Sequence, residues 1–328
     1  MSASTFRLEH MPVSAVFIGA TKSAGIGSLR FPSLTTTVPR ELVHRASVAE
    51  VMLTGWERKD DSHFSVAAQW PRLHSFFTPV DGQHDPLIIA ETIRQAGILL
   101  AHAEFGVPLD HHFLMWDLAL ETKPSQLLVS DVPASLDMDI AFLDVKRRRN
   151  GLAGAHLELV IRRDGQVAAT GSATFTCTSP GVYRRMRALS TPGAAEPSPL
   201  LAPTAPQTVG RVSPTDVVLS PTEETDRWRL RVDTRHPVLF DHPVDHVPGM
   251  MLLEAARQAT AAHLGRPCVP IGIISDFRRY VELNTPCMVE AYRLEGWGPA
   301  SEEAVVVTGH QEGELVFQIT VTVARPSV

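Results

Sequence analysis

The chain carries one pattern twice, and this internal repeat limits its fold more than any other feature. Residues 74–96 and 236–259 each contain two histidines ten positions apart and, further on, the sequence Glu-x-x-Arg-Gln-Ala. Residues 44–55 (HRASVAEVMLTG) and 210–221 (GRVSPTDVVLSP) echo one another upstream. Further matches follow downstream in the same order, which indicates a duplicated unit rather than chance.

The repeat sets the expected domain boundaries. The first unit is predicted over residues 40–185 and the second over residues 208–328. Between them, residues 186–207 include a run rich in Pro, Ala and Ser without apolar periodicity, which is typical of a linker. Residues 1–39 have no repeat partner and are predicted to be an N-terminal extension.

Each unit contains a long apolar helix followed by strands. The first helix is predicted from Pro86 to about Phe105, with Asp85 as its cap, and the second from Pro248 to about Leu264. Both are apolar on most faces, as buried helices are. The later segments alternate and turn at residues 164–165 (Asp-Gly), a hairpin signal. We therefore predict an α+β double hot-dog, in which two antiparallel sheets each wrap around one central helix.

Composition excludes several classes of protein. The chain has 328 residues and a net charge of −6, so no basic excess points to nucleic acid. Three distant cysteines argue against a disulfide scaffold or a cysteine zinc site and fit a reducing cytoplasm. No segment approaches the length of a membrane span. A glycine-rich phosphate loop and a nucleophile elbow are also missing, and we expect no cofactor.

Both predicted helices carry a charged stripe. The spacing places Glu91, Arg94 and Gln95 on one helix face, and the second helix repeats the stripe with Glu254, Arg257 and Gln258. On an exposed helix such a stripe is a surface ion pair worth about 0.2–0.5 kcal/mol. On a buried helix the charges must be paired or must face a polar cavity. We favour a functional site, with structural pairing as the alternative.

The turn before the second helix is rich in histidine. His242 and His246 are four residues apart and flanked by aspartates, but Pro243 breaks any helix between them. We therefore predict no metal site, and weigh a structural turn against a histidine used in acid–base chemistry. His84 is the counterpart of His246 in the first repeat. Asp117 and Asp276 lie on matching strands and are candidates for supporting residues, or else ordinary strand-end residues. His84 and His246, like Asp117 and Asp276, are therefore candidates for supporting residues.

The chain resembles the A-factor biosynthesis proteins of filamentous actinobacteria most clearly in three stretches, residues 39–56, 84–118 and 236–259. The resemblance extends from Phe31 to the C-terminus. It implies a double hot-dog enzyme that joins a β-ketoacyl thioester, held on acyl carrier protein, to dihydroxyacetone phosphate. The product leads to a γ-butyrolactone, butenolide or furan signalling molecule. The resemblance also implies functional roles for Glu91, Arg94, Glu254 and Arg257.

Residues 242–259 are also similar to the motif of β-hydroxyacyl thioester dehydratases, in which a histidine precedes a Pro-Gly turn and a Leu-Leu-Glu helix. His242 matches that histidine only if the turn is two residues shorter here. For the reaction with dihydroxyacetone phosphate that the first resemblance implies, we expect Glu91, Glu254 or His242 as the base and Arg94 or Arg257 as the phosphate ligand, with Gln95 and Gln258 beside them. Residues 87–90 and 250–253 are expected to line an acyl tunnel. A hot-dog dehydratase or thioesterase and a non-catalytic acyl-binding regulator remain alternatives.

The two repeats differ at the start of the helix. Aligning the helices backwards from their glutamates puts Gly249 opposite Pro86, whereas aligning the prolines makes Gly249 an insertion. Either way the first repeat lacks this glycine, and proline has no N–H to donate. We therefore predict that the Gly249 amide holds the thioester carbonyl and that the halves are not equivalent.

Overall fold

The computed structural model of the protein describes residues 35–148, 151–190 and 199–326. Almost all of the predicted extension and the centre of the predicted linker lie outside the described residues. Residues 36–328 group together as one unit.

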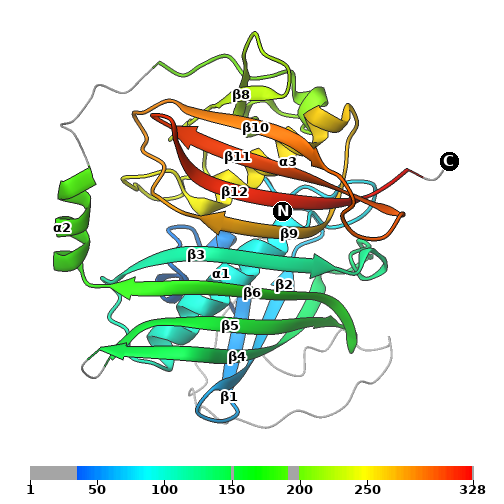
Figure 1. The fold of residues 1–328 in the computed structure, drawn as a ribbon. Helices are drawn as coiled ribbons and strands as arrows, with labels where there is room; N and C mark the ends of the chain where they lie inside the picture. The colour runs from blue at the N-terminus through cyan, green and yellow to red at the C-terminus, as the bar shows by residue number, and fades with distance from the viewer. Residues whose placement is uncertain (1–34, 149–150, 191–198, 327–328) are drawn as a thin grey trace, which may run out of the picture. The chain divides into compact units, whose positions relative to one another are not determined.

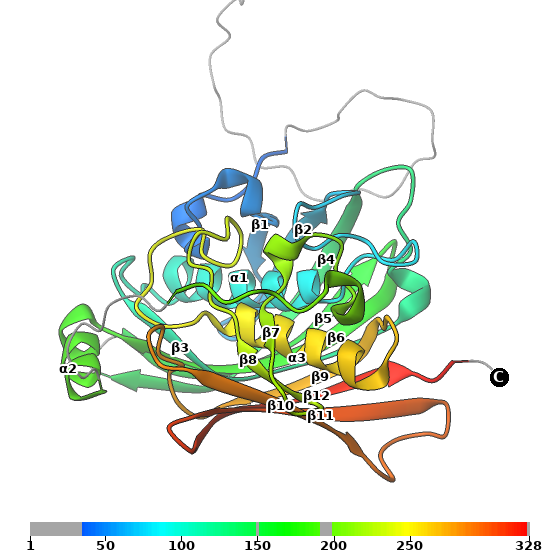
Figure 2. The same ribbon diagram turned by 90° about the horizontal axis from the view of Figure 1, so that it is seen from above.

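Two long helices form the centre of this unit. Helix α1 spans Leu87–Ala103 and helix α3 spans Gly249–Leu264, close to the predicted bounds. Every residue of α1 except Arg94 and Ala103 is buried, and α3 is buried except at its two ends. Seen from above, both helices lie on the same side of the sheet (Figure 2). The apolar character of the two segments is explained by this burial.

The strands of the described residues form one antiparallel sheet of 12 strands, in the order β1-β2-β4-β5-β6-β3-β9-β12-β11-β10-β8-β7 (Figure 1). The first half contributes β1 (Leu53–Arg58), β2 (His63–Trp70), β3 (His112–Thr122), β4 (Ala134–Arg148), β5 (Gly151–Arg163) and β6 (Gln166–Thr178). The second half contributes β7 (Leu219–Pro221), β8 (Arg227–Leu230), β9 (Pro270–Phe277), β10 (Cys287–Leu294), β11 (Glu302–Gln311) and β12 (Glu314–Ala324). The strand order of the second half mirrors that of the first, which is the double hot-dog arrangement that the repeat predicts.

The halves meet where β3 pairs with β9, from Asp117 opposite Asp276 to Glu121 opposite Gly272. The hydroxyl of Ser275 bonds both the N–H and the C=O of Leu118 across this seam, at 3.0 and 2.7 Å. The two predicted sheets are thus joined into one, because the two inner edge strands pair with each other. Such pairing covers two edges that would otherwise present unpaired backbone groups.

Short 3-10 helices precede the first strand of each half. They are η1 (Arg40–Val43) and η2 (Val48–Glu50) in the first half, and η4 (Pro206–Val209) and η5 (Pro214–Asp216) in the second. A further one, η3 (Pro124–Gln126), follows β3. The residue that ends η1, His44, and the residue that ends η4, Gly210, both have left-handed backbone conformations. The two halves therefore match residue by residue in this region.

Helix α2 (Pro180–Ser190) follows the last strand of the first half, beside the sheet (Figure 1). It continues into the segment predicted as a linker, whose residues 191–198 lie outside the described residues. At the far end of that segment the N–H of Thr204 donates to the C=O of Leu219, so the chain has joined the second half there.

The two long helices begin differently. The Asp85 carboxylate accepts from the Leu87 N–H at 2.9 Å, which confirms Asp85 as the cap, and Pro86 is already helical with ψ −20°. In the second half Pro248 is extended, with ψ 142°, and Gly249 is the first helical residue. Pro86 and Gly249 are therefore structurally equivalent, in agreement with the alignment from the glutamates.

Candidate functional site

The charged stripe of α1 is part of a buried cluster that we name the first clamp: Glu91, Arg45, Arg94 and Gln95. The Glu91 carboxylate is fully buried and accepts from both arginines, at distances of 2.6–3.0 Å. Gln95 adds a third donor, its Nε2 lying 2.6 Å from Oε1 of Glu91. Both carboxylate oxygens are thereby occupied.

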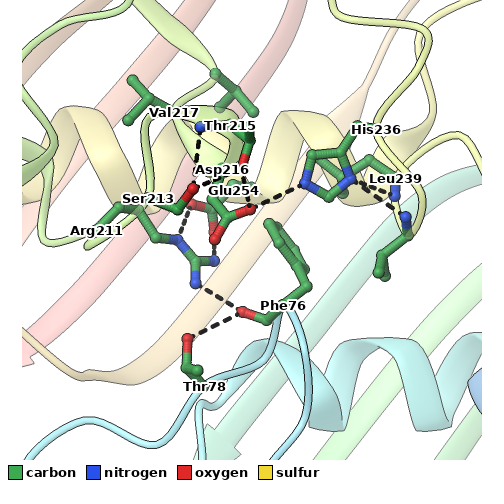
Figure 3. A network of polar contacts seen from close by, with 12 residues as sticks. Phe76, Thr78, Arg211, Ser213, Thr215, Asp216, Val217, His236, Leu239 and Glu254 are labelled. Carbon is green, nitrogen blue, oxygen red and sulfur yellow. Dashed lines mark hydrogen bonds and ion pairs between the residues drawn. The ribbon is translucent and has the colours of Figure 1, made fainter.

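The second half repeats this cluster as the second clamp: Glu254, Arg211, Arg257 and Gln258. Arg211 and Arg257 each bond both oxygens of the carboxylate, at 2.6–2.9 Å, and Gln258 also donates to Glu254. Figure 3 shows Arg211 reaching on from Glu254 to the carbonyl oxygen of Phe76, 2.7 Å away in the first half. The second clamp thus links the halves.

Both glutamates are held in the ionised form. Burial alone would raise the pKa of Glu91, but the Arg45 and Arg94 guanidinium groups outweigh it and lower the pKa to about 2. The same balance of burial against Arg211 and Arg257 gives Glu254 a pKa of about 2. A carboxylate with both oxygens occupied and so low a pKa is a weak proton acceptor.

The two glutamines also tie each helix to the chain in front of the first strand. Gln95 accepts from the Met52 N–H and donates to the Glu50 carbonyl, at 2.9 and 2.7 Å. Gln258 makes the matching pair with the Val218 N–H and the Asp216 carbonyl, at 3.0 and 2.8 Å. These bonds satisfy backbone groups that would otherwise be buried without partners.

A cavity of about 770 Å³ lies at the junction of the two halves. Its walls come from the Arg94 face of α1, from β3, from α2, from the end of β9 and from the turn and first residues of α3. Of the predicted site residues, those that line it are Arg94, His242, His246 and Gly249. The predicted site residues that do not line the cavity are Glu91, Glu254, Arg257, Gln95, Gln258, His84, Asp117 and Asp276.

Only the first of the two clamps opens into this cavity. The Arg94 side chain is 20% exposed, whereas that of its counterpart Arg257 is 4% exposed. The Phe76 ring lies 4.4 Å from the Arg211 guanidinium and covers the second clamp. The counterpart of Phe76 in the second repeat is Val238, which contacts Arg45 of the first clamp through its carbonyl oxygen. An aromatic ring in one half and a smaller valine in the other thus distinguish the closed clamp from the open one.

His242 joins the cavity wall to the first clamp. Its Nδ1 bonds Asp241, which in turn lies 3.4 Å from Arg45 and accepts from the Ala46 N–H at 2.9 Å. The bond to Asp241 orients the ring and leaves Nε2 for other partners. His242 comes from the second half and Arg94 from the first, so the cavity collects groups from both repeats.

The N-terminus of α3 also faces the cavity. No described residue accepts a hydrogen bond from the Gly249 N–H. At the equivalent end of α1, Pro86 has no N–H and the next amide, that of Leu87, is taken by Asp85. A free amide at the positive end of a helix is suited to bind a carbonyl oxygen or an anion.

The remaining predicted residues have structural contacts. His246 lines the cavity and bonds Asp245 at 2.8 Å, and Asp245 also accepts from Tyr183 and Arg187 of α2 at 2.6 and 3.0 Å. His84 is buried against Trp70, with ring centres 5.5 Å apart. Asp117 faces Asp276 across the seam, and Asp276 pairs with Arg278 at 2.8 Å. Neither aspartate forms an ion pair with a helix arginine among the described residues.

Arg45 and Arg211 were not among the predicted site residues, although each completes a clamp. The signal was present in the sequence, because they stand at the same position of the matched stretches 44–55 and 210–221. An arginine repeated at one position of a duplicated unit that also repeats a buried glutamate is a candidate partner for that glutamate. Their distance from the glutamates along the chain, 46 residues for Arg45 and 43 for Arg211, concealed the pairing.

Two other possibilities receive no support in the described parts of the chain. No group of three or more His, Cys, Asp or Glu side chains there could hold a metal ion. None of the helices described is both long and apolar enough to cross a membrane.

A continuous sheet around two central helices, with clamp glutamates and a cavity between the repeats, defines a tandem hot-dog protein. The family model for the A-factor biosynthesis hotdog domain matches residues 28–179 and 193–325. The chain belongs to this A-factor biosynthesis hotdog family.

Relatives of known name are similar over most of the chain. A 2-oxo-3-(phosphooxy)propyl 3-oxoalkanoate synthase of Streptomyces virginiae is 54% identical over 288 residues, covering 87% of this chain and 96% of the relative. A protein of the same name from Streptomyces coelicolor is 44% identical over 316 residues, covering 95% and 98%. A solved structure described as an oleoyl thioesterase of Lactobacillus plantarum has a TM-score of 0.51 at 11% identity, covering 82% and 99%. That likeness concerns the fold alone.

Proposed function

We propose that the protein joins a 3-oxoacyl group, delivered as a thioester on acyl carrier protein, to the hydroxyl of dihydroxyacetone phosphate. The product is the ester that the relatives' name describes, and it is the first precursor of a γ-butyrolactone-type signal. The observation that carries the proposal is the single cavity that brings together a guanidinium group, an imidazole and a free helix amide. These groups match a phosphate, a transferable proton and a thioester carbonyl.

Arg94 is the proposed phosphate ligand. Its Nε and Nη2 are held by Glu91, and no described residue accepts from its Nη1. The clamp therefore fixes the guanidinium plane and leaves one nitrogen for a ligand in the cavity. A pre-oriented arginine loses little side-chain freedom when it binds an oxyanion. Arg257, which the sequence offered as an equal candidate, is sealed within the second clamp.

The Gly249 amide is the proposed oxyanion donor. Attack of the hydroxyl on the thioester places negative charge on the carbonyl oxygen, and an amide at a helix start stabilises that charge without reorganising. No side chain at this position blocks the approach of the carbonyl. The thioester carbonyl is therefore bound by the second half and the phosphate by the first.

His242 is the proposed acid–base residue for the departing thiolate. In the reaction the hydroxyl oxygen forms the ester bond and gives its proton to a base, and the carbon–sulfur bond breaks. The sulfur takes up the Nε2 proton of His242 in its imidazolium form, whose Nδ1–H stays on Asp241. Asp241 holds the opposite nitrogen and so keeps Nε2 directed away from the first clamp. The saturated oxygens of Glu91 and Glu254 make them holders of the arginines in this scheme rather than bases.

The acyl chain is proposed to lie along the apolar walls of the cavity. In α1 these are Ile93, Gly97 and Ile98, and in α3 they are Met250, Leu252 and Leu253. Three of the four residues 250–253 line the cavity, whereas residues 87–90, which were also expected to line an acyl tunnel, do not. Carrier-bound acyl thioesters are cytoplasmic metabolites, and we propose the same location for the enzyme.

The test is incubation of the purified protein with a 3-oxoacyl carrier thioester, with and without dihydroxyacetone phosphate, followed by mass spectrometry. The proposal expects the phosphorylated ester only when the acceptor is present. Release of free acid or loss of water from the acyl chain would indicate a thioesterase or dehydratase instead. Absence of turnover would indicate an acyl-binding regulator. Arg94→Leu should abolish the ester, while Arg148→Leu, an exposed arginine outside the cavity, should not.

A further inference from the structure

One histidine on the cavity wall occupies a backbone position that suits glycine. His44 ends η1 with φ 51° and ψ 53°, and its counterpart Gly210 ends η4 with φ 68° and ψ 30°. Glycine adopts this conformation freely, whereas a residue with a Cβ is strained by roughly 1 kcal/mol or more. The other described non-glycine residues with positive φ are all Asp or Glu. Strain of this kind persists where the surrounding structure holds it, often at functional sites.

The side chain of His44 is fixed by a second histidine. Its Nε2 lies 2.9 Å from Nε2 of His102, and the Nδ1 of His102 lies 2.7 Å from the carbonyl oxygen of Val107. Phe113 packs edge-on against both imidazoles, with ring centres 5.4 and 5.1 Å away. The ring of His44 is therefore held in one orientation.

These contacts determine where the protons lie. A carbonyl only accepts, so His102 must carry its proton on Nδ1. Burial, together with the nearby His102 and Arg94, lowers the pKa of His44 to about 4, and burial also lowers that of His102, so both rings are neutral at neutral pH. His102 Nε2 is then an acceptor and His44 Nε2 its donor. The remaining nitrogen, His44 Nδ1, carries a lone pair and no proton.

This lone pair belongs to a residue of the cavity. His44 lines the cavity beside Arg45 and Arg94, and Arg94 and His242 are close enough to act electrostatically on its ring. No described residue donates a hydrogen bond to His44 Nδ1. A nitrogen that can only accept thus belongs to the same cavity wall as Arg94, the proposed phosphate ligand.

The second half cannot offer such a group. A Cβ at Gly210 would lie 3.4 Å from Nη1 of Arg257 and 3.9 Å from the Ala261 side chain. An imidazole there would displace the arginine of the closed clamp. The histidine is therefore present only in the half whose clamp opens into the cavity.

We propose that His44 takes the proton of the attacking hydroxyl, as a catalytic base distinct from His242. The hydroxyl proton moves to His44 Nδ1 while the oxygen bonds to the thioester carbonyl carbon. The thiolate leaves with the Nε2 proton of the His242 imidazolium, and solvent carries the proton taken up by His44 back to His242, so that no net proton is gained or lost. His102 is a positioning residue, because it fixes the His44 tautomer and accepts from its Nε2–H. This inference rests on the proposed function.

Two substitutions separate catalysis from folding. His44→Gly installs the residue that the second half carries at this position and relieves the left-handed backbone, so the variant should fold. General base catalysis contributes about 10²–10⁴-fold, and because the pKa of His44, about 4, lies below neutral pH, kcat should fall by about 10²-fold, the lower end of that range. His44→Asn keeps an acceptor oxygen and tolerates the left-handed backbone, but it cannot take up a proton. It should keep the acceptor KM within about threefold and lose kcat as fully as the glycine variant.

The deciding readout is chemical rescue of His44→Gly by added imidazole and its methyl derivatives. The proposal expects ester formation to return, with a rescue rate that rises with the pKa of the added base. Full turnover by His44→Asn, or a folded His44→Gly with wild-type kcat, would overturn it. So would inactivity of His44→Gly with a lowered Tm and no rescue, which indicates a structural role. If the wild-type protein itself forms no ester, the proposed function fails instead.

Discussion

Replacing Gly249 by proline should remove one catalytic hydrogen bond and leave the fold intact. Pro86 already occupies the equivalent position of α1, and proline is favoured at the first position of a helix. The preceding residue, Pro248, is extended with ψ 142°, which is the conformation required in front of a proline. Because the Gly249 N–H has no partner among the described residues, no bond of the fold is lost. We expect the free energy of unfolding to stay within about 1 kcal/mol of the wild type.

The catalytic effect should be large by comparison. Loss of one oxyanion donor lowers kcat by about 10²–10³-fold, or roughly 2.7–4 kcal/mol. The matched control is Gly249→Ala, whose added methyl would lie 3.7 Å from the Phe277 ring, an ordinary contact, and which keeps the N–H. Mass spectrometry of ester formation gives kcat for each variant, and circular dichroism confirms that each variant is folded. A folded Gly249→Pro enzyme with normal kcat would refute the assignment of the carbonyl to this amide.

Three further outcomes are expected. Arg94→Lys keeps the charge but lacks the planar group that bonds Glu91 and still leaves one nitrogen for a ligand, so steady-state kinetics should give a raised acceptor KM with little change in Tm. An unchanged KM would remove Arg94 from the phosphate site. Glu254 has a pKa of about 2 in the folded protein against an ordinary 4.5. Its ionised form therefore stabilises the fold by on the order of 3 kcal/mol above pH 4.5, and this stabilisation is lost as the pH falls from 4.5 towards 2. The difference in urea-unfolding free energy between wild type and Glu254→Gln should shrink over that range, and a constant difference would contradict the clamp. Phe76→Ala should cost about 3–5 kcal/mol of stability in the same assay and leave the kcat of the folded protein unchanged, because Phe76 covers only the closed clamp.

Much of the fold could be predicted because the repeat and the buried helices are local patterns. The 3.6-residue spacing that places Glu91, Arg94 and Gln95 on one face holds in any helix, and Asp85 followed by Pro86 is a local start signal. The family and the double hot-dog arrangement are both confirmed. The hairpin at Asp164 and Gly165 is confirmed as well, since both residues have positive φ. The joining of the two sheets was not predictable, because it depends on which edges of the folded units meet.

The site was predicted less completely because the duplicated sequence hides the differences between the halves. Glu91 and Glu254 look equal in the chain, and so do Arg94 and Arg257. What separates them is tertiary contact: Phe76 covers one clamp, and the other opens into the cavity. The local difference at Gly249 was visible, since it changes the residue type at a helix start. The difference between His44 and Gly210 was equally visible but has meaning only once the backbone conformation is known.

We propose that each chain has one site, built from both repeats, and not two equivalent sites. Calorimetric titration of the wild type with the phosphorylated 3-oxoalkanoate ester measures the number of sites directly. A single shared site predicts one ester bound per chain, with binding weakened at least tenfold in Arg94→Leu and unchanged in Arg148→Leu. Two esters bound per chain, or one bound with unchanged affinity in Arg94→Leu, would contradict it.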